Sequence, residues 1–267
     1  MNESSEPLPF GAGSVGEVLI GSTLVLTIQA QHRRNSLSAA VRQGLHAGLA
    51  RADDEAGVRA VVITAEGRTF SSGGDFIEDF GPLASGSRGD AWEVVGGYFR
   101  LFDHIERCRV PVIAAVNGPA IGGGLEVIMA SDLAVAVDTA TFAPIEGRAV
   151  GTPSGWTLLR AAERLDHKVA SELLLTGSII DAETALSWGL VNRLVPPDEL
   201  MSAALRWGEA IAGVSAHAVN QSKRYLREQA RTFDADVVRE LVVEAFATQE
   251  SKDAIAGFFT KPAEPAP

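Results

Sequence analysis

Three short, continuous apolar runs constrain the fold of this chain more than any other feature of its sequence. They cover residues 60–64, 111–116 and 133–137, and none of them contains a charged side chain. A strand with one face in water alternates apolar and polar residues, whereas a strand that is buried on both faces is apolar throughout. We therefore predict three strands that lie inside the molecule.

Helical patterns separate these runs. In residues 37–49 leucine or valine recurs at every fourth position, which places these side chains on one face of a helix. Residues 92–107 and 122–130 are also predicted to be helical, and two shorter β-like runs, 15–20 and 24–28, precede the first helix. An alternation of strands and helices indicates an α/β fold.

The last third of the chain is predicted to be mostly helical, with one short strand at 190–195. Residues 1–13 are polar and rich in glycine, proline and serine, so we expect a flexible N-terminal tail. The helices expected after the apolar runs are 158–163, 169–175, 182–188, 199–212, 216–229 and 236–249.

Charge and composition exclude several classes of partner. The formal net charge is -11, which is unfavourable for nucleic acid and for anionic membrane surfaces. The longest uncharged run, 110–125, is shorter than the ~20 residues that span a bilayer. The single cysteine, Cys108, forms no intramolecular disulfide, and the first residues lack a secretory signal. We expect a soluble, cytoplasmic protein.

Three other motifs carry less weight. Residues 11–16 match the glycine pattern of dinucleotide sites, but no strand precedes them and no helix follows. Ser154 is expected to cap the following helix rather than to act as a hydrolase nucleophile, because its neighbours do not form a nucleophile elbow. The five histidines are scattered without metal-ligand spacing, so no metal site is predicted.

Two glycine-rich loops lie next to the predicted strands, at 70–76 and 117–126. Each is either a tight turn without a ligand or a site where free backbone N–H groups approach one, because glycine permits such close approach. Two N–H groups that converge on one carbonyl oxygen form an oxyanion hole. Glu126, in the first turn of an otherwise apolar helix, favours a tuned acid or base, and Glu146 is a second carboxylate that can divide these duties with it.

Four segments together resemble the enoyl-CoA hydratase/isomerase family, also called the crotonase superfamily. Residues 35–37 (NSL), 70–75 (FSSGGD) and 117–126 (NGPAIGGGLE) are similar to three family motifs, in the family order. Residues 174–191 are similar to a fourth, which reads L-x-T-G, two alanines and G-L-V. The resemblance covers about residues 15–262. It implies a crotonase-like spiral of ββα turns in residues 14–197 and a C-terminal helical oligomerisation region in residues 198–267.

The resemblance also implies roles for four residues. Gly74 and Gly123 match the positions whose backbone N–H groups bind the thioester oxygen of an acyl-CoA. Glu126 matches the carboxylate that positions and deprotonates water, and Glu146 matches the one that delivers a proton to the α-carbon. Both carboxylates together imply hydration of a 2-enoyl-CoA, with no cofactor beyond the coenzyme A of the substrate and no metal.

Substrate-binding residues follow from the same resemblance, with two departures from the family pattern. A proline is usual before the first motif, where this chain has residues 31–34, and glycines are usual where it has residues 154–157. Trp156 there either reshapes the acyl pocket or packs in the core. The residues expected to contact acyl-CoA are His32, Arg33, Arg34, Ser72, Gly74, Asp75, Phe76, Gly123, Trp156 and Lys261.

Other functions remain open at this stage. An isomerase or a specialised hydratase-lyase of the same family uses the same groups differently, and a non-catalytic acyl-CoA-binding scaffold belongs to a different class. The family also implies a homotrimer, or a hexamer made of two trimers.

Overall fold

A six-stranded sheet forms the centre of the molecule. The computed structural model describes residues 15–229 and 234–260. The strand order is β1-β2-β3-β4-β6-β9, in which β1 and β2 are antiparallel and the other neighbours are parallel. The strands of this sheet are β1 (Val15–Ile20), β2 (Thr23–Ile28), β3 (Ala60–Ala65), β4 (Val112–Val116), β6 (Leu133–Val137) and β9 (Arg193–Val195).

The predicted burial of the apolar runs is confirmed. Every residue of β3 and β4 is buried, as is every residue of β6 except Leu133. Two helices, α1 (Ala39–Asp54) and α8 (Leu200–Ala212), pack against strands of this sheet. The strand expected at 190–195 is shorter, because β9 begins only at Arg193.

A second, three-stranded sheet has the order β5-β7-β8. Its strands are only two or three residues long, namely β5 (Ala120–Ile121), β7 (Thr141–Ala143) and β8 (Ile180–Asp181). The chain visits the two sheets in alternation: β4 is followed by β5 and helix α3 (Gly123–Ala130), and β6 is followed by β7. This alternation is the predicted α/β spiral of ββα turns. These short strands were not predicted from the sequence, because two or three residues are too few to show a hydrophobic period.

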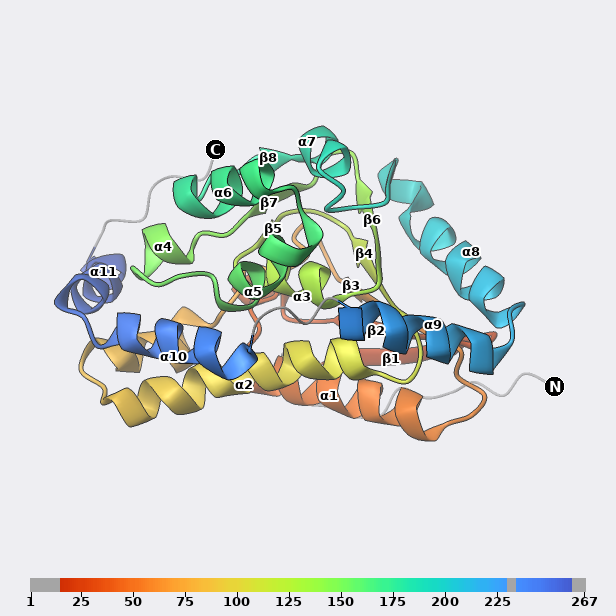
Figure 1. The fold of residues 1–267 in the computed structure, drawn as a ribbon, viewed down its shortest axis with the longest axis horizontal. Helices are drawn as coiled ribbons and strands as arrows, with labels where there is room; N and C mark the ends of the chain where they lie inside the picture. Colours follow the sequence, from red (N-terminus) through yellow and green to blue (C-terminus); the bar gives the residue numbers. More distant parts are fainter. Residues whose placement is uncertain (1–14, 230–233, 261–267) are drawn as a thin grey trace.

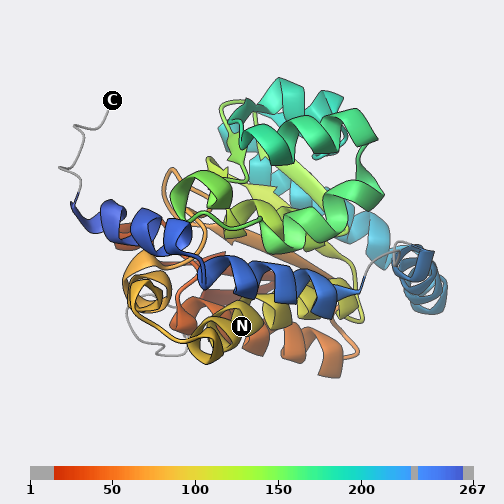
Figure 2. The ribbon, with the colours of Figure 1, turned by 60° about the vertical axis from the view of Figure 1, so that its left-hand side comes forward.

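The remaining helices surround this spiral (Figures 1 and 2). α10 (Ala235–Phe246) lies along α2 (Arg88–Arg107). α9 (Ala216–Gln229) lies at one side of the molecule in Figure 2, and its buried Lys223 joins it to the body through Asp132 (2.6 Å). These helices are α2 (Arg88–Arg107), α4 (Glu146–Ala149), α5 (Gly155–Arg164), α6 (His167–Thr176), α7 (Ala182–Ser187), α9 (Ala216–Gln229), α10 (Ala235–Phe246) and α11 (Gln249–Thr260).

Two differences from the sequence prediction concern the last helices and a cap. The single helix expected at 236–249 ends at Phe246, and α11, which was not predicted, begins three residues later. The Ser154 hydroxyl makes no capping bond to α5, so that part of the prediction is wrong. Its hydroxyl instead donates to a carboxylate, as described below. None of the described helices is long and apolar enough to cross a membrane.

Candidate active site

Asn35 joins the loop after β2 to the loop after β3. Arg34 and Asn35 both have positive φ angles (52° and 55°), a conformation that asparagine tolerates better than most residues. The buried Asn35 side chain accepts from the Ala30 N–H (3.0 Å) and donates to the carbonyls of Glu66 (2.9 Å) and Thr69 (2.7 Å). The first residue of the NSL motif thus has a structural role: it positions the glycine loop that follows Thr69.

The other two residues of this motif orient that glycine loop. The Ser36 hydroxyl donates to Asp75 (2.8 Å), and the Leu37 N–H donates to the Gly73 carbonyl (2.8 Å). In a planar trans peptide the C=O and the following N–H point in opposite directions. The Gly74 N–H therefore points away from Leu37, and no described group accepts a hydrogen bond from it.

The second glycine loop begins α3 against the first. Gly122 has a φ of +54°, which favours glycine, and Gly123 is the first residue of the helix. The N–H groups in the first turn of a helix have no partner within it, and they carry its partial positive charge. A side-chain carbon on Gly73 would lie 2.9 Å from the Gly123 nitrogen, so the two loops are in contact. The N–H groups of Gly74 and Gly123 thus belong to adjoining backbone segments.

Glu126 is buried in the first turn of α3, with 6 % of its surface exposed. Its Oε1 accepts from the backbone N–H groups of Trp156 (2.6 Å) and Thr157 (3.3 Å), in the first turn of α5. Burial and the neighbouring Glu146 carboxylate raise the pKa of Glu126 to about 8, although the two N–H groups act in the opposite direction. The carboxylate therefore lies in an environment suited to proton transfer near neutral pH.

Glu146 is the first residue of α4 and lies against the start of α3. A side-chain carbon on Gly122 would be 2.6 Å from its Oε1, so only glycine leaves room for this carboxylate. Its Oε2 accepts a hydrogen bond from the Ser154 hydroxyl. Burial raises the pKa of Glu146, and the Ser154 hydroxyl lowers it by stabilising the charged form.

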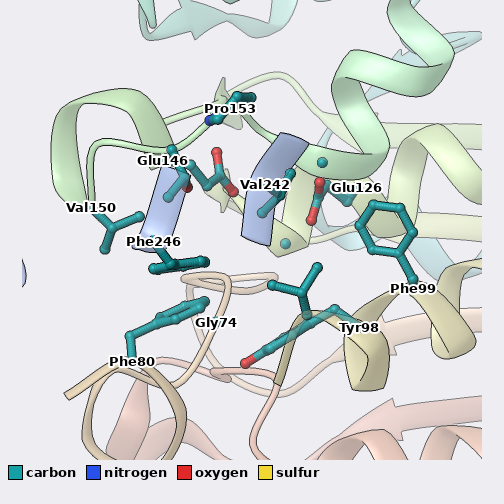
Figure 3. Close-up of a pocket in the computed structure, with 14 residues that line it drawn as sticks. Gly74, Phe80, Tyr98, Phe99, Glu126, Glu146, Val150, Pro153, Val242 and Phe246 are labelled. Atoms are coloured by element: carbon teal, nitrogen blue, oxygen red, sulfur yellow. The ribbon is translucent and has the colours of Figure 1, made fainter. Parts of the chain in front are cut away.

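We call the space between these groups the central pocket. Both carboxylates line it, and the rings of Phe80 and Tyr98 lie across from them (Figure 3). Its volume is about 50 Å³. Its walls come from both glycine loops, α2, the segment 146–155 and α10, and the lining residues are Gly74, Phe80, Val95, Tyr98, Phe99, Gly123, Glu126, Glu146, Val150, Thr152, Pro153, Gly155, Val242 and Phe246.

A larger space, the mouth hollow, shares Gly74 with the central pocket and measures about 540 Å³. Arg33 at its rim is paired with Asp75 (3.0 Å) and Glu78, and these hydrogen bonds raise the pKa of Arg33. The Phe76 ring stacks on Phe258 of α11, with 4.0 Å between the ring centroids. The lining residues are His32, Arg33, Arg34, Ser36, Ser72, Gly74, Asp75, Phe76, Ile77, Ile121, Ile145 and Phe258.

The structure brings most of the sequence-predicted residues together around these two spaces. Trp156 is different: its side chain is 1 % exposed, packs against Phe102 and does not line the central pocket. Its contribution to the site is the backbone N–H that binds Glu126. Lys261 lies outside the described residues, as do the first four residues of the 11–16 motif.

Sequence reasoning missed several residues of the pocket. Tyr98 donates to Asp79 (2.5 Å) and accepts from the N–H of Asp75 (3.0 Å), the residue after Gly74. Phe80 and Phe246 complete the apolar wall. These side chains come from segments without a recognisable motif. Their aromatic character is the one signal in the sequence that could have indicated them. Among the described residues, no three His, Cys, Asp or Glu side chains are grouped to bind a metal.

Comparison with known proteins identifies the class of protein. Residues 21–263 match the model of the enoyl-CoA hydratase/isomerase family. This match covers most of the chain, and the glycine loops and paired carboxylates described above lie within it. The chain therefore belongs to the enoyl-CoA hydratase/isomerase family.

Curated relatives and solved structures agree with this assignment. A probable enoyl-CoA hydratase of Mycobacterium bovis is 30 % identical over 243 residues, 89 % of this chain and 91 % of the relative. A carnitinyl-CoA dehydratase of Proteus mirabilis is 32 % identical over 78 % of this chain and 77 % of its own length. The crystal structure of an enoyl-CoA hydratase/isomerase from Mycobacterium paratuberculosis superimposes with a TM-score of 0.83 at 27 % identity, and covers 92 % of this chain and 98 % of the other.

Proposed function

We propose that this protein is an enoyl-CoA hydratase, which adds water across the 2,3 double bond of an acyl-CoA thioester. One observation carries the proposal: two carboxylates with raised pKa values line one small pocket together with Gly74 and Gly123. A scaffold that only binds acyl-CoA has no need of a buried and a half-buried carboxylate in one pocket, because removing a charge from water is costly.

The two glycine N–H groups polarise the thioester in this proposal. Their hydrogen bonds to the carbonyl oxygen withdraw electrons from the double bond, so the β-carbon becomes electrophilic. When water adds there, the negative charge moves to the same oxygen as an enolate. Donors that are already oriented stabilise this charge without reorganisation. The Leu37 N–H supports this arrangement, because its bond to the Gly73 carbonyl directs the Gly74 N–H away from it.

The two carboxylates then divide the proton transfers. Ionised Glu126 removes a proton from water as the water oxygen bonds to the β-carbon, and protonated Glu146 gives a proton to the α-carbon. Mutual repulsion, which raises the pKa of Glu126, favours a pair that carries a single proton. That proton can reside on either carboxylate, and the reaction uses the arrangement with the proton on Glu146 and Glu126 ionised. No cofactor beyond the coenzyme A of the substrate takes part.

Coenzyme A occupies the mouth hollow in this proposal, since that space shares Gly74 with the central pocket. Arg34 and His32 at its rim form no ion pair with any described residue, whereas Arg33 is already paired with two carboxylates. Arg34 and His32 are therefore better placed than Arg33 to meet the phosphates of the ligand.

Substitution of each carboxylate tests the catalytic roles. Glu126→Gln and Glu146→Gln are each expected to lower kcat for hydration of crotonyl-CoA about 10²–10⁴-fold, the usual contribution of a general acid or base. Loss of the ultraviolet absorbance of the conjugated thioester measures the rate, and the exposed Glu183→Gln serves as the control. Wild-type rates in both variants contradict the proposal. If wild-type protein moves the double bond but adds no water, the protein is an isomerase.

We also propose that the protein is a homotrimer or a dimer of trimers. Large apolar side chains remain exposed on the later helices, and such surface is typical of subunit interfaces. A monomer in light scattering at micromolar concentration contradicts this proposal. The exposed side chains include Leu175, Leu186, Tyr225, Leu226, Val237 and Leu241.

A further inference from the structure

A third space adjoins the central pocket at Phe99 and shares no described lining residue with the mouth hollow. This rear hollow measures about 620 Å³ and is lined mainly by charged groups, including Arg100, Asp103, Arg160 and Arg239. Within the described residues, Phe99 is the one residue that lines both the rear hollow and the central pocket. The mouth hollow, the central pocket and the rear hollow are thus linked in series, first through Gly74 and then through Phe99.

The Phe99 ring is packed firmly between the two spaces. It is 8 % exposed and meets the Trp156 ring edge to face, with 5.4 Å between the centroids. A side-chain carbon on Gly155 would lie 2.6 Å from the Phe99 ring, so the ring occupies the space that a larger residue at 155 would need. Val242 of α10 flanks the same position. Because of these contacts, the Phe99 ring cannot rotate out of its position unless neighbouring core residues also move.

The central pocket itself is small. Its volume is about 50 Å³, and on this measure one water molecule needs about 10–15 Å³. The central pocket therefore accommodates roughly four groups of the size of a water molecule. The carbons beyond the thioester carbonyl of a four-carbon enoyl group fit this space. A longer chain meets Phe99, and forcing extra methylene groups into a packed wall is unfavourable.

We propose that Phe99 closes the far end of the acyl pocket and restricts this protein to short-chain acyl-CoA substrates of about four carbons. This inference rests on the proposed function only in that the ligand is an acyl-CoA. The rear hollow is not an extension of the acyl pocket in the wild-type protein, because the ring separates the two. Its mainly charged lining also gives a hydrocarbon chain few apolar contacts, which come chiefly from Phe99 and Trp156.

Removal of the ring has a specific expected result. In Phe99→Ala the central pocket opens into the rear hollow, and a long chain can extend through the gap. Methylene groups in an apolar pocket each add about fourfold to affinity, but those in a charged, open hollow add almost nothing. The variant is therefore expected to bind long and short acyl-CoAs about equally, without a preference for long chains.

Calorimetry with butyryl-, hexanoyl- and decanoyl-CoA measures this effect without turnover, because these saturated thioesters have no double bond to hydrate. Wild-type protein is expected to bind decanoyl-CoA at least about tenfold more weakly than butyryl-CoA, and Phe99→Ala to reduce this ratio to about threefold or less. Phe246→Ala is the matched control, since Phe246 lines only the central pocket. It is expected to tolerate hexanoyl-CoA but still to discriminate against decanoyl-CoA.

The outcomes separate this inference from the proposed function. Equal binding of all three ligands by wild-type protein, or an unchanged ratio in Phe99→Ala, overturns the role of Phe99. A chain-length ratio that behaves as predicted in a protein that hydrates no enoyl-CoA supports the role of Phe99 and contradicts the hydratase. If Phe99→Ala does not fold, Phe99→Leu provides the test, with a smaller reduction of the ratio expected.

Discussion

Ser154 offers a sensitive test of how the two carboxylates share their proton. Its hydroxyl donates to Glu146 and makes no capping bond to α5. Ser154→Ala therefore removes one hydrogen bond to the carboxylate without removing a helix cap. The remaining surroundings of Glu146, namely Gly122 and the apolar wall, stay the same.

The size of the effect follows from the kind of bond that is lost. A hydrogen bond to a charged group contributes about 1.5–3 kcal/mol, and 1.36 kcal/mol corresponds to one pKa unit. Because the hydroxyl stabilises ionised Glu146, its removal raises the pKa of Glu146 and shifts the protonation equilibrium of this carboxyl by a factor of about ten or more. Hydration needs Glu146 protonated and Glu126 ionised. The alkaline limb of the profile of kcat/KM against pH, where the pair loses its last proton, should therefore move to higher pH.

Initial rates of crotonyl-CoA hydration across the pH range measure this shift. The acid limb, where Glu126 gains a proton, should move much less. Ser131→Ala is the control, because Ser131 is also a buried serine near α3, but its hydroxyl donates to the Val127 carbonyl (2.8 Å). An alkaline limb that stays in place or moves to lower pH in Ser154→Ala would refute the assignment of Glu146 as the proton donor.

Two further predictions concern groups behind the site. Tyr98→Phe leaves the Asp75 N–H without a partner, at a cost of about 1–3 kcal/mol, whereas the Asp79 carboxylate keeps its ion pair with Arg42. If Tyr98 positions Gly74, kcat should fall about tenfold with little change in KM; an equal loss in kcat and in binding of butyryl-CoA would indicate a general structural defect. Glu106→Gln should lower the free energy of unfolding by about 3 kcal/mol, because buried Glu106 pairs with Arg160 (2.6 Å). Urea denaturation at fixed protein concentration measures this change. The control is Glu228→Gln, which removes an exposed ion pair with Arg224 and should change the free energy of unfolding by less than about 1 kcal/mol.

Local patterns predicted much of this site because its backbone elements are local. The apolar runs of β3 and β4 are buried throughout, and the glycine loops lie beside them as expected. Glu126 was recognised because a carboxylate in an apolar helix is conspicuous within a few residues of sequence. Asn35 was recognised only as part of a motif, and its contacts with Glu66 and Thr69 required the structure.

The partners of the two carboxylates could not be predicted in this way. Ser154 was expected to cap a helix, and Trp156 was considered as a wall of the acyl pocket. In the structure the Ser154 hydroxyl donates to Glu146, and the backbone N–H of Trp156 donates to Glu126. The start of α5 contacts both carboxylates only because α3, α4 and α5 converge in the fold. The sequence pattern of a helix start does not show which residues that helix start contacts.

The sequence by itself determined the fold class, the family and the two carboxylates, because continuous apolar strands, glycine turns and a charge within an apolar helix are properties of neighbouring residues. Only the tertiary structure decided the shape of the pocket and the surroundings of those carboxylates. Phe80, Tyr98, Phe99 and Phe246 come from α2, α10 and the segment before α2, and they form one wall through contacts between residues far apart in the chain. Such contacts depend on how the helices pack, and no local pattern in the sequence records that packing.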